Sequence, residues 1–141
     1  MTVDQISVFV QNRAGQLGDV TRALRDAQVN IRAMSLSDTT DFGVLRLMVD
    51  NAVRAQSALQ AAGFTAGTTP VIAAELPDRP GGLDGVLALL AGKGINVEYL
   101  YGYTQRSSSE ATLVFRFDRM DEAENLLKEN GIRVLSAADL G

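Results

Sequence analysis

The sequence contains no cysteine, no histidine and no tryptophan. Without cysteine and histidine the chain has no disulfide framework, no thiolate or imidazole ligand for a metal ion, and none of the common pairs of nucleophile and base. Arg13 and Arg79 are the only candidates for a phosphate cradle, and no evident base accompanies them. We therefore expect no metal site, no cofactor and no catalytic residue, and we do not expect an enzyme.

Positive charge and long apolar runs are also scarce. The 13 Lys and Arg residues are outnumbered by 17 Asp and Glu, which gives a net charge of -4. Such a chain repels phosphate backbones and anionic lipid, and no run of basic residues makes a local exception. The strongest apolar run, Val86 to Ala91, is too short to span a bilayer. We expect a cytoplasmic protein without nucleic-acid or membrane partners.

What the sequence does contain is an internal repeat. The segment from Asn12 to Val20 returns as the segment from Asp78 to Val86. Each half of the 141 residues is one unit, and we place the units at residues 1–69 and 70–141, with only Gly67 to Pro70 between them. A unit of this size buries only about 60% of its unfolded surface, so we expect the halves to pack together or two chains to form a homodimer.

Hydrophobic periodicity predicts the same elements in both copies. Apolar residues alternate from Ile6 to Val10, as in a strand with one buried face, and then recur at helical spacing from Leu17 to Ala27. Polar stretches over 38–41 and 105–109 are expected to be hairpin loops. In the first copy we predict strands over 6–10, 30–37, 42–50 and from 64, with helices over 17–27 and 52–63; in the second, strands over 71–76, 96–104, 110–118 and 133–136, with helices over 83–90 and 123–127.

This β-α-β-β-α-β order predicts an α+β fold with two ferredoxin-like units. In each unit both helices lie on one face of an antiparallel four-stranded sheet, and the other face is left for a partner. RNA-binding domains, metal carriers and acylphosphatases share the order, so the fold alone does not give a function. Each of these rivals needs aromatic, basic or cysteine residues that this sequence does not place correctly.

The first strand-to-helix turn of each unit is the most informative segment. Gly15 in one copy, and Gly81 with Gly82 in the other, remove side chains where a helix begins, so free backbone N–H groups face a ligand. Helix N-termini favour a carboxylate. Asn12 and Asp78 are placed either to cap the helix or to accept a ligand ammonium. The alternative is that these residues only build a tight turn.

The segments at 12–17 (N-R-A-G-Q-L) and 78–83 (D-R-P-G-G-L), with Asn-Ile at 30–31 and Ile-Asn-Val at 95–97, resemble ACT domains, the ferredoxin-like regulatory modules that bind amino acids. The resemblance covers the chain as two tandem units. It implies that ligands bind at interfaces between ACT units, near the first turn and the start of the second strand. The candidate ligand residues are Asn12, Arg13, Ala14, Gly15, Gln16, Leu17 and Asn30 in the first copy, and Asp78, Arg79, Pro80, Gly81, Gly82, Leu83 and Asn96 in the second.

The tyrosines Tyr99, Tyr101 and Tyr103 are spaced to lie on one face of one strand. The matching residues of the first copy are Ala33, Ser35 and Ser37, so the copies have diverged here. One interpretation is a packing surface between units. The other is a wall that selects an apolar or aromatic amino acid, which adds Tyr101 to the candidate ligand residues.

Two functions of different classes follow. The first is a regulatory module that binds an amino acid and modulates a metabolic enzyme in trans, because 141 residues leave no room for a catalytic domain beside two ACT units. The second is a structural subunit of an amino-acid biosynthetic enzyme, similar to the small subunit of acetolactate synthase, without a ligand of its own. In both cases we expect a homo-oligomer, in the simplest case a dimer.

Overall fold

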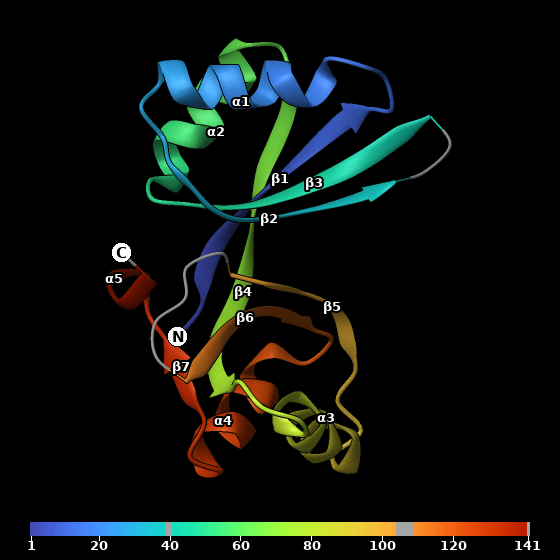
Figure 1. The fold of residues 1–141 in the computed structure, drawn as a ribbon, viewed down its shortest axis with the longest axis vertical. Coiled ribbons are helices and arrows are strands. Elements are labelled where there is room, and N and C mark those ends of the chain that lie inside the picture. The colour runs from blue at the N-terminus through green and yellow to red at the C-terminus, as the bar shows by residue number, and fades with distance from the viewer. Residues whose placement is uncertain (39–40, 104–108, 141) are drawn as a thin grey trace. The chain divides into compact units, whose positions relative to one another are not determined.

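The computed structural model describes residues 1–38, 41–103 and 109–140. The chain divides into two compact units. We call Asp4–Thr69 the first unit, and Met1–Val3 together with the chain from Pro70 onward the second unit. Each unit is an antiparallel sheet with helices on one face (Figure 1), which confirms the predicted α+β class and the repeated β-α-β-β-α-β order.

The first unit contains a four-stranded sheet whose strands lie in the order β2-β3-β1-β4. Both β2 and β1 pair antiparallel with β3. Helices α1 and α2 cover one face of this sheet (Figure 1). Its elements are β1 (Val3–Gln11), α1 (Gln16–Asp26), β2 (Ile31–Asp38), β3 (Phe42–Val49), α2 (Ala52–Ala61) and the beginning of β4 (Thr65–Pro77).

The core of the first unit follows from the alternation in β1. Ile6 and Val8 point toward the helices, directly opposite Leu47 and Leu45 of β3, and all four side chains are fully buried. Each such side chain contributes about 1.5–3 kcal/mol when it leaves water. The helices complete this core with Val20, Leu24, Ala55 and Leu59.

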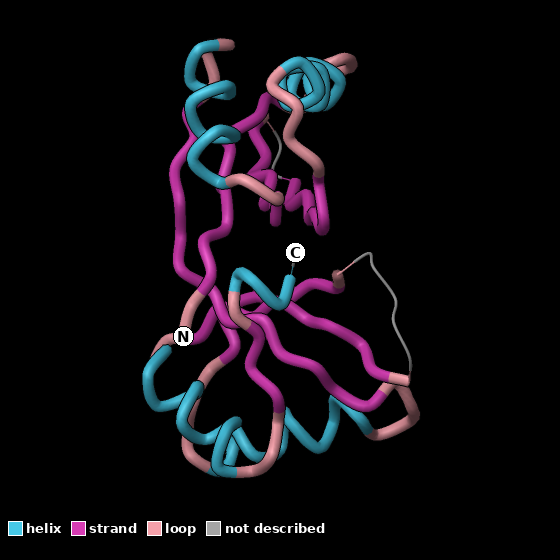
Figure 2. Tube along the Cα trace, turned by 90° about the vertical axis from the view of Figure 1, so that its left-hand side faces the viewer, coloured by secondary structure: helices cyan, strands magenta, loops and turns pink. Residues whose placement is uncertain are grey.

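The second unit repeats this plan, with strand order β7-β4-β6-β5. Figure 2 shows its long helices along one side of its strands. Its core contains Phe115 and Phe117, whose rings stack with centroids 5.3 Å apart. Its elements are the rest of β4, then α3 (Gly82–Gly92), β5 (Val97–Gly102), β6 (Glu110–Phe117), α4 (Met120–Glu129), β7 (Arg133–Leu135) and α5 (Ala137–Leu140).

The two copies share an irregularity in strand pairing at the same position. The register of β2 on β3 shifts between Ile31 and Ala33, and the register of β5 on β6 shifts between Val97 and Tyr99. These positions are equivalent in the repeat. The sequence repeat is therefore a structural repeat at the level of single residue pairs.

One predicted boundary between strands is wrong. The sequence analysis expected a strand from residue 64, a connection over Gly67 to Pro70 and a new strand over 71–76. The structure instead has one strand, β4, that runs from Thr65 to Pro77 and belongs to both units. Threonine favours strands, and proline holds the residue before it in extended backbone, so Thr68, Thr69 and Pro70 continue the strand instead of breaking it.

Other differences concern element ends and loops. The strand expected over 96–104 ends at Gly102, although the Tyr103 N–H still donates to the Thr112 carbonyl at 2.9 Å. The loops expected over 38–41 and 105–109 include residues 39–40 and 105–108, which lie outside the described residues. Among the residues that are described, no helix has both the length and the apolar character of a membrane span.

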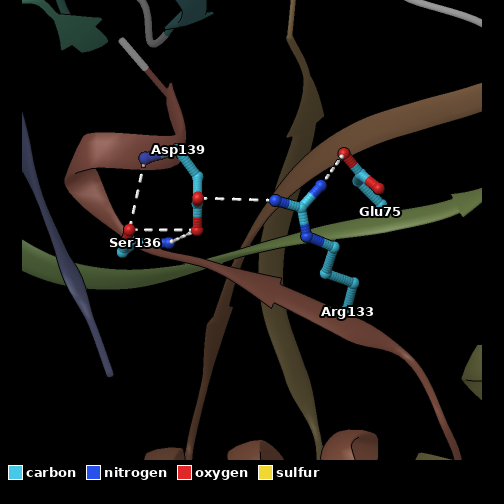
Figure 3. Close-up of polar contacts among 4 residues, drawn as sticks. All are labelled: Glu75, Arg133, Ser136 and Asp139. Atoms are coloured by element: carbon cyan, nitrogen blue, oxygen red, sulfur yellow. Dashed lines mark hydrogen bonds and ion pairs between the residues drawn. The ribbon is translucent and has the colours of Figure 1, made fainter.

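The sequence analysis missed the short helix α5. Its N-terminus is held by reciprocal bonds, because Asp139 accepts from the Ser136 N–H at 2.9 Å and donates its own N–H to the Ser136 hydroxyl at 3.2 Å. Arg133 reaches Asp139 at 3.4 Å and Glu75 of β4 at 3.0 Å (Figure 3). This cluster joins α5 to the sheet of the second unit.

Candidate functional site

The two strand-to-helix turns have nearly the same backbone conformation. Gly15 (φ 87°, ψ -14°) and Gly81 (φ 86°, ψ -7°) both lie in the left-handed region, and each is the N-cap of its helix. L-residues with a side chain rarely adopt this conformation, so the turn requires glycine at both positions. The prediction that these glycines shape the start of each helix agrees with this geometry.

The N-cap residue of each helix is a glycine, which has no side chain with which to cap the helix. The backbone N–H groups of Asn12 and Asp78 donate to the carbonyls of Asp41 and Ser109, at 2.9 and 2.8 Å, which ties each turn to the start of the third strand of its unit.

Some backbone N–H groups in the first turn of each helix make no hydrogen bond within the helix. In α1 the Gln16 N–H donates to the Arg13 carbonyl at 3.3 Å and the Asp19 N–H to the Gly15 carbonyl at 3.0 Å. Because the first four N–H groups of a helix have no intrahelical partner, the amides of Leu17 and Gly18 are available to a ligand. The same bonds recur in α3, which leaves the amides of Leu83 and Asp84 there.

The two turns differ where the strand meets the helix. In the first unit the buried Gln16 side chain accepts the Gln11 N–H through Oε1 at 3.0 Å. The equivalent residues of the second unit are Gly82 and Pro77. Proline has no N–H, so no acceptor is needed, and a Cβ on Gly82 would overlap the Pro77 carbonyl oxygen. The pair therefore changes together from glutamine and glutamine to proline and glycine.

A small hollow of about 80 Å³ adjoins the first turn. The apolar side chains of Val10, Leu17 and Leu36 line it, and so does Gly43. Gln16 also lines it, as do the neighbouring polar residues of the turn. The hollow thus combines apolar side chains with the hydrogen-bonding groups of the turn.

A larger and more open hollow of about 620 Å³ is also lined by Gln16. Phe9 and Phe42 line it with more than half of their surface exposed. Arg22 and Asp19 also line it and form an ion pair at 3.1 Å. Gln16 is therefore part of the wall of both hollows.

Asn30 and Asn96 do not lie at these turns within their own units. The Asn30 N–H donates to Asp50 at 3.0 Å, just beyond the last residue of β3, whereas Gln11, at the turn, lies opposite the first residue of β3. The equivalent bond joins the Asn96 N–H to Asp118 at 2.9 Å. Within one unit, the length of a strand thus separates the predicted residue Asn30 from the turn.

The other predicted ligand residues differ in how far their side chains are exposed to solvent. Arg13, Ala14, Arg79 and Pro80 are exposed in the turns, and Leu17 is 37% exposed. Tyr101 is buried, opposite Val114 on the face of the sheet that points away from the Phe115 side. It is therefore not at the Gly81 helix start but across the sheet from it.

Sequence reasoning missed Leu36 and Gly43, which line the small hollow. A signal for Leu36 was present, because it alternates with Ser35 and Ser37 along a predicted strand and so shares a face with the core. The paired change at Gln11 and Gln16 was also visible in the repeat, but only the fold shows that the two residues touch.

Comparison with known proteins identifies the family to which the chain belongs. A family model described as an ACT domain pair matches residues 1–141. Among curated proteins, no sequence matches the chain. Among solved structures, protein BT0572 from Bacteroides thetaiotaomicron is 34% identical, with a TM-score of 0.92 over 99% of this chain and 96% of that one.

Two further structures share the fold at lower identity. The regulatory subunit of aspartate kinase from Thermus thermophilus, in its ligand-free form, is 16% identical, with a TM-score of 0.65 over 89% of this chain and 91% of that one. The corresponding subunit from Thermus flavus is 17% identical, with a TM-score of 0.62 over 89% and 88%. At these identities the likeness concerns the fold of the chain.

Proposed function

Because the chain belongs to the ACT family as an ACT domain pair, we propose that it is a regulatory module that binds an amino acid and modulates a metabolic enzyme in trans. The observation that carries the proposal is the first turn of α1, where the N-cap residue Gly15 brings no side chain to the helix start. An amino acid brings the carboxylate that such a helix start favours. The fold shared with aspartate kinase regulatory subunits supports a regulatory role.

The affinity expected of such a site is moderate. Each charge-assisted bond from a backbone N–H contributes about 1.5–3 kcal/mol, and the helix dipole about 0.3–1 kcal/mol. Two or three such bonds with a buried apolar side chain approach about 8 kcal/mol, which corresponds to micromolar binding. Because Asn30 and the turn lie a strand length apart in one unit, we propose that the ligand binds between two ACT units.

A thermal-shift screen against the twenty standard amino acids tests this proposal. An amino acid at a hundred times its dissociation constant adds about 2.7 kcal/mol to the free energy of unfolding, which raises the melting temperature by several degrees. We expect at least one amino acid to produce such a shift. If none of the twenty does so at millimolar concentration, the chain is not an amino-acid sensor.

A second candidate function is a structural subunit, similar to the small subunit of acetolactate synthase, that joins an enzyme without binding a ligand. The exposed aromatic residues Phe9 (58%) and Phe42 (55%) favour it, because solvated rings are a common feature of partner surfaces. Co-purification of an enzyme in the absence of any thermal shift would select this function over the first.

A further inference from the structure

The sheet of the second unit has an open face, on the side away from α3 and α4, and α5 lies on that side. Leu135 ends β7, and Ser136 connects it to α5. Figure 2 shows this last helix, beside the label C, on the opposite side of the strands from the long helices. The second unit is therefore covered on both faces of its sheet.

Four residues, here called the polar row, form one line across this open face. Glu75 of β4 lies opposite Arg133 of β7 and opposite Thr112 of β6. Tyr103, just beyond β5, is the fourth member, because its N–H donates to the Thr112 carbonyl at 2.9 Å. Side chains alternate between the two faces along a strand, and Ala74 belongs to the core. The side chains of the polar row therefore point away from α3 and α4.

The contacts of α5 reach both ends of the polar row. At one edge of the sheet, the Arg133 guanidinium contacts Asp139 of α5 at 3.4 Å and Glu75 at 3.0 Å (Figure 3). At the other edge, the Tyr103 hydroxyl donates to the carbonyl of Leu140, the last residue of α5, at 3.3 Å. Since β7 and β5 are the outermost strands of this unit, α5 is fastened from edge to edge.

This attachment depends on polar contacts near the surface. None of the four residues of α5 is buried. The side chains of Arg133 and Asp139 keep 58% and 35% of their surface in solvent. Ion pairs this exposed contribute little to stability, and a helix of one turn is not stable by itself. We therefore expect α5 to detach at a much lower cost in free energy than the unfolding of the whole unit.

The neighbouring row of the same face is apolar. Leu135, Ala73, Val114 and Tyr101 pair with one another across the four strands. Tyr101 is 8% exposed, and the other three are at most 3% exposed. Each of the four lies two positions along the chain from a member of the polar row, so the two rows are neighbours on one face. The attachments of α5 thus lie directly beside a buried apolar surface.

We propose that α5 is a strap that closes the open face of the second unit, and that its release exposes the tyrosines of this face while the sheet stays folded. The occupant of the face is a segment of the chain itself. The first unit has Ala33, Ser35 and Ser37 where the second has its tyrosines, so the copies differ at the surface to which the strap is fastened. One turn of helix then controls access to this surface. The inference goes beyond the proposed amino-acid site and does not depend on it.

The sequence supplies its own probe for the test. Its three tyrosines are at 99, 101 and 103, and it contains no tryptophan, so quenching of tyrosine fluorescence by acrylamide reports on this strand alone. Asp139→Ala removes the carboxylate that contacts Arg133 and accepts the Ser136 N–H. We expect the quenching constant to rise by about twofold or more because the strap opens locally, with the far-ultraviolet circular dichroism unchanged.

A matched control removes a carboxylate on the other side of the sheet. Glu129 is exposed at the end of α4, and Glu129→Ala changes the net charge by the same amount as Asp139→Ala. The control should leave the quenching constant at its wild-type value. Equal quenching in the two variants would overturn the inference.

Amide hydrogen exchange of the wild-type chain gives a second measurement. The Leu140 N–H donates to the Ser136 carbonyl at 3.2 Å. If α5 opens independently, this amide should exchange at least about a hundredfold faster than the paired amides of β6 in the middle of the sheet. Equal protection of α5 and β6 would contradict the inference, because the two would then open together.

The stability of Asp139→Ala completes the test. If this variant loses the sheet of the second unit, as judged by circular dichroism, α5 is an integral part of the fold and the strap is ruled out. If the variant keeps its sheet and its tyrosines become accessible, the strap is supported, whether or not the chain binds an amino acid.

Discussion

At the scale of single residues, the two turns differ at a pair of residues that contact each other, and both members of the pair differ. A backbone N–H at Gln11 requires an acceptor, and Gln16 supplies it. A proline at the equivalent position removes that requirement, and a glycine then lets the helix start approach the strand closely. A proline alone would leave the Gln16 oxygen without its N–H donor, and a side chain at Gly82 would overlap the Pro77 carbonyl oxygen.

This close approach makes Gly82 and Gly85 respond in opposite ways to the same change. In Gly82→Ala the new Cβ overlaps the Pro77 carbonyl oxygen, so the start of α3 must shift, and we expect a loss of about 1–3 kcal/mol in the free energy of unfolding. In Gly85→Ala nothing lies within 4 Å, and the helix gains about 0.5–1 kcal/mol. Urea unfolding of the two variants measures both, and a loss in Gly85→Ala equal to that in Gly82→Ala would contradict the explanation.

The sequence predicts single residues where local chemistry decides them. Gly15 and Gly81 were expected to shape their turns because glycine is the residue that adopts a left-handed conformation readily. The bond from Gln11 to Gln16 was not predictable in the same way, since glutamine is compatible with many environments and its partner is set by the fold. Asn30 was placed near the turn by analogy, and strand length separates them in one unit.

At the scale of elements, α5 depends on a carboxylate. The Ser136 N–H, then the Ser136 hydroxyl, and then the charge of Arg133 hold the pKa of Asp139 below its ordinary value. A lowered pKa means that the folded state favours the ionised form. The contribution to stability is therefore present above the pKa of the unfolded chain and is lost as the pH falls through the pKa of the folded chain.

We expect α5 to loosen below about pH 4, before the rest of the second unit unfolds. A carboxyl titration of Asp139 by NMR should give a midpoint below that of an aspartate in an unfolded peptide. In Ser136→Ala the midpoint should rise, because the hydroxyl bond is gone while the backbone bond remains. A midpoint equal to the peptide value in the wild-type chain would show that the cap does not form.

Elements with a clear hydrophobic period in the sequence were predictable, whereas those without one were not. The helices α1 and α3 follow directly from apolar spacing, since Leu24 and Leu90 recur on the buried face of each. The continuity of β4 through Pro70 was missed because proline usually marks a boundary, and here the strand passes from one unit to the other at that residue. The four residues of α5 are too few for a periodic signal.

At the scale of the whole molecule, we predict a homodimer. The first unit exposes Phe9, Met34, Leu36 and Phe42, each with more than 40% of its surface in solvent. Two small units with such exposed side chains are stabilised by association. Light scattering at micromolar concentration should give about twice the chain mass of 15.1 kDa. A mass of one chain at that concentration would contradict the prediction.

The central claim is that an amino acid binds at the start of α1, and amide NMR tests it most directly. When the amino acid that most raises the melting temperature is titrated into the isotope-labelled chain, the backbone amides of Leu17 and Gly18 and the side-chain amide of Gln16 should show the largest shift changes. Saturable changes that spare Leu17, Gly18 and Gln16, or no changes with any of the twenty amino acids, would contradict the account.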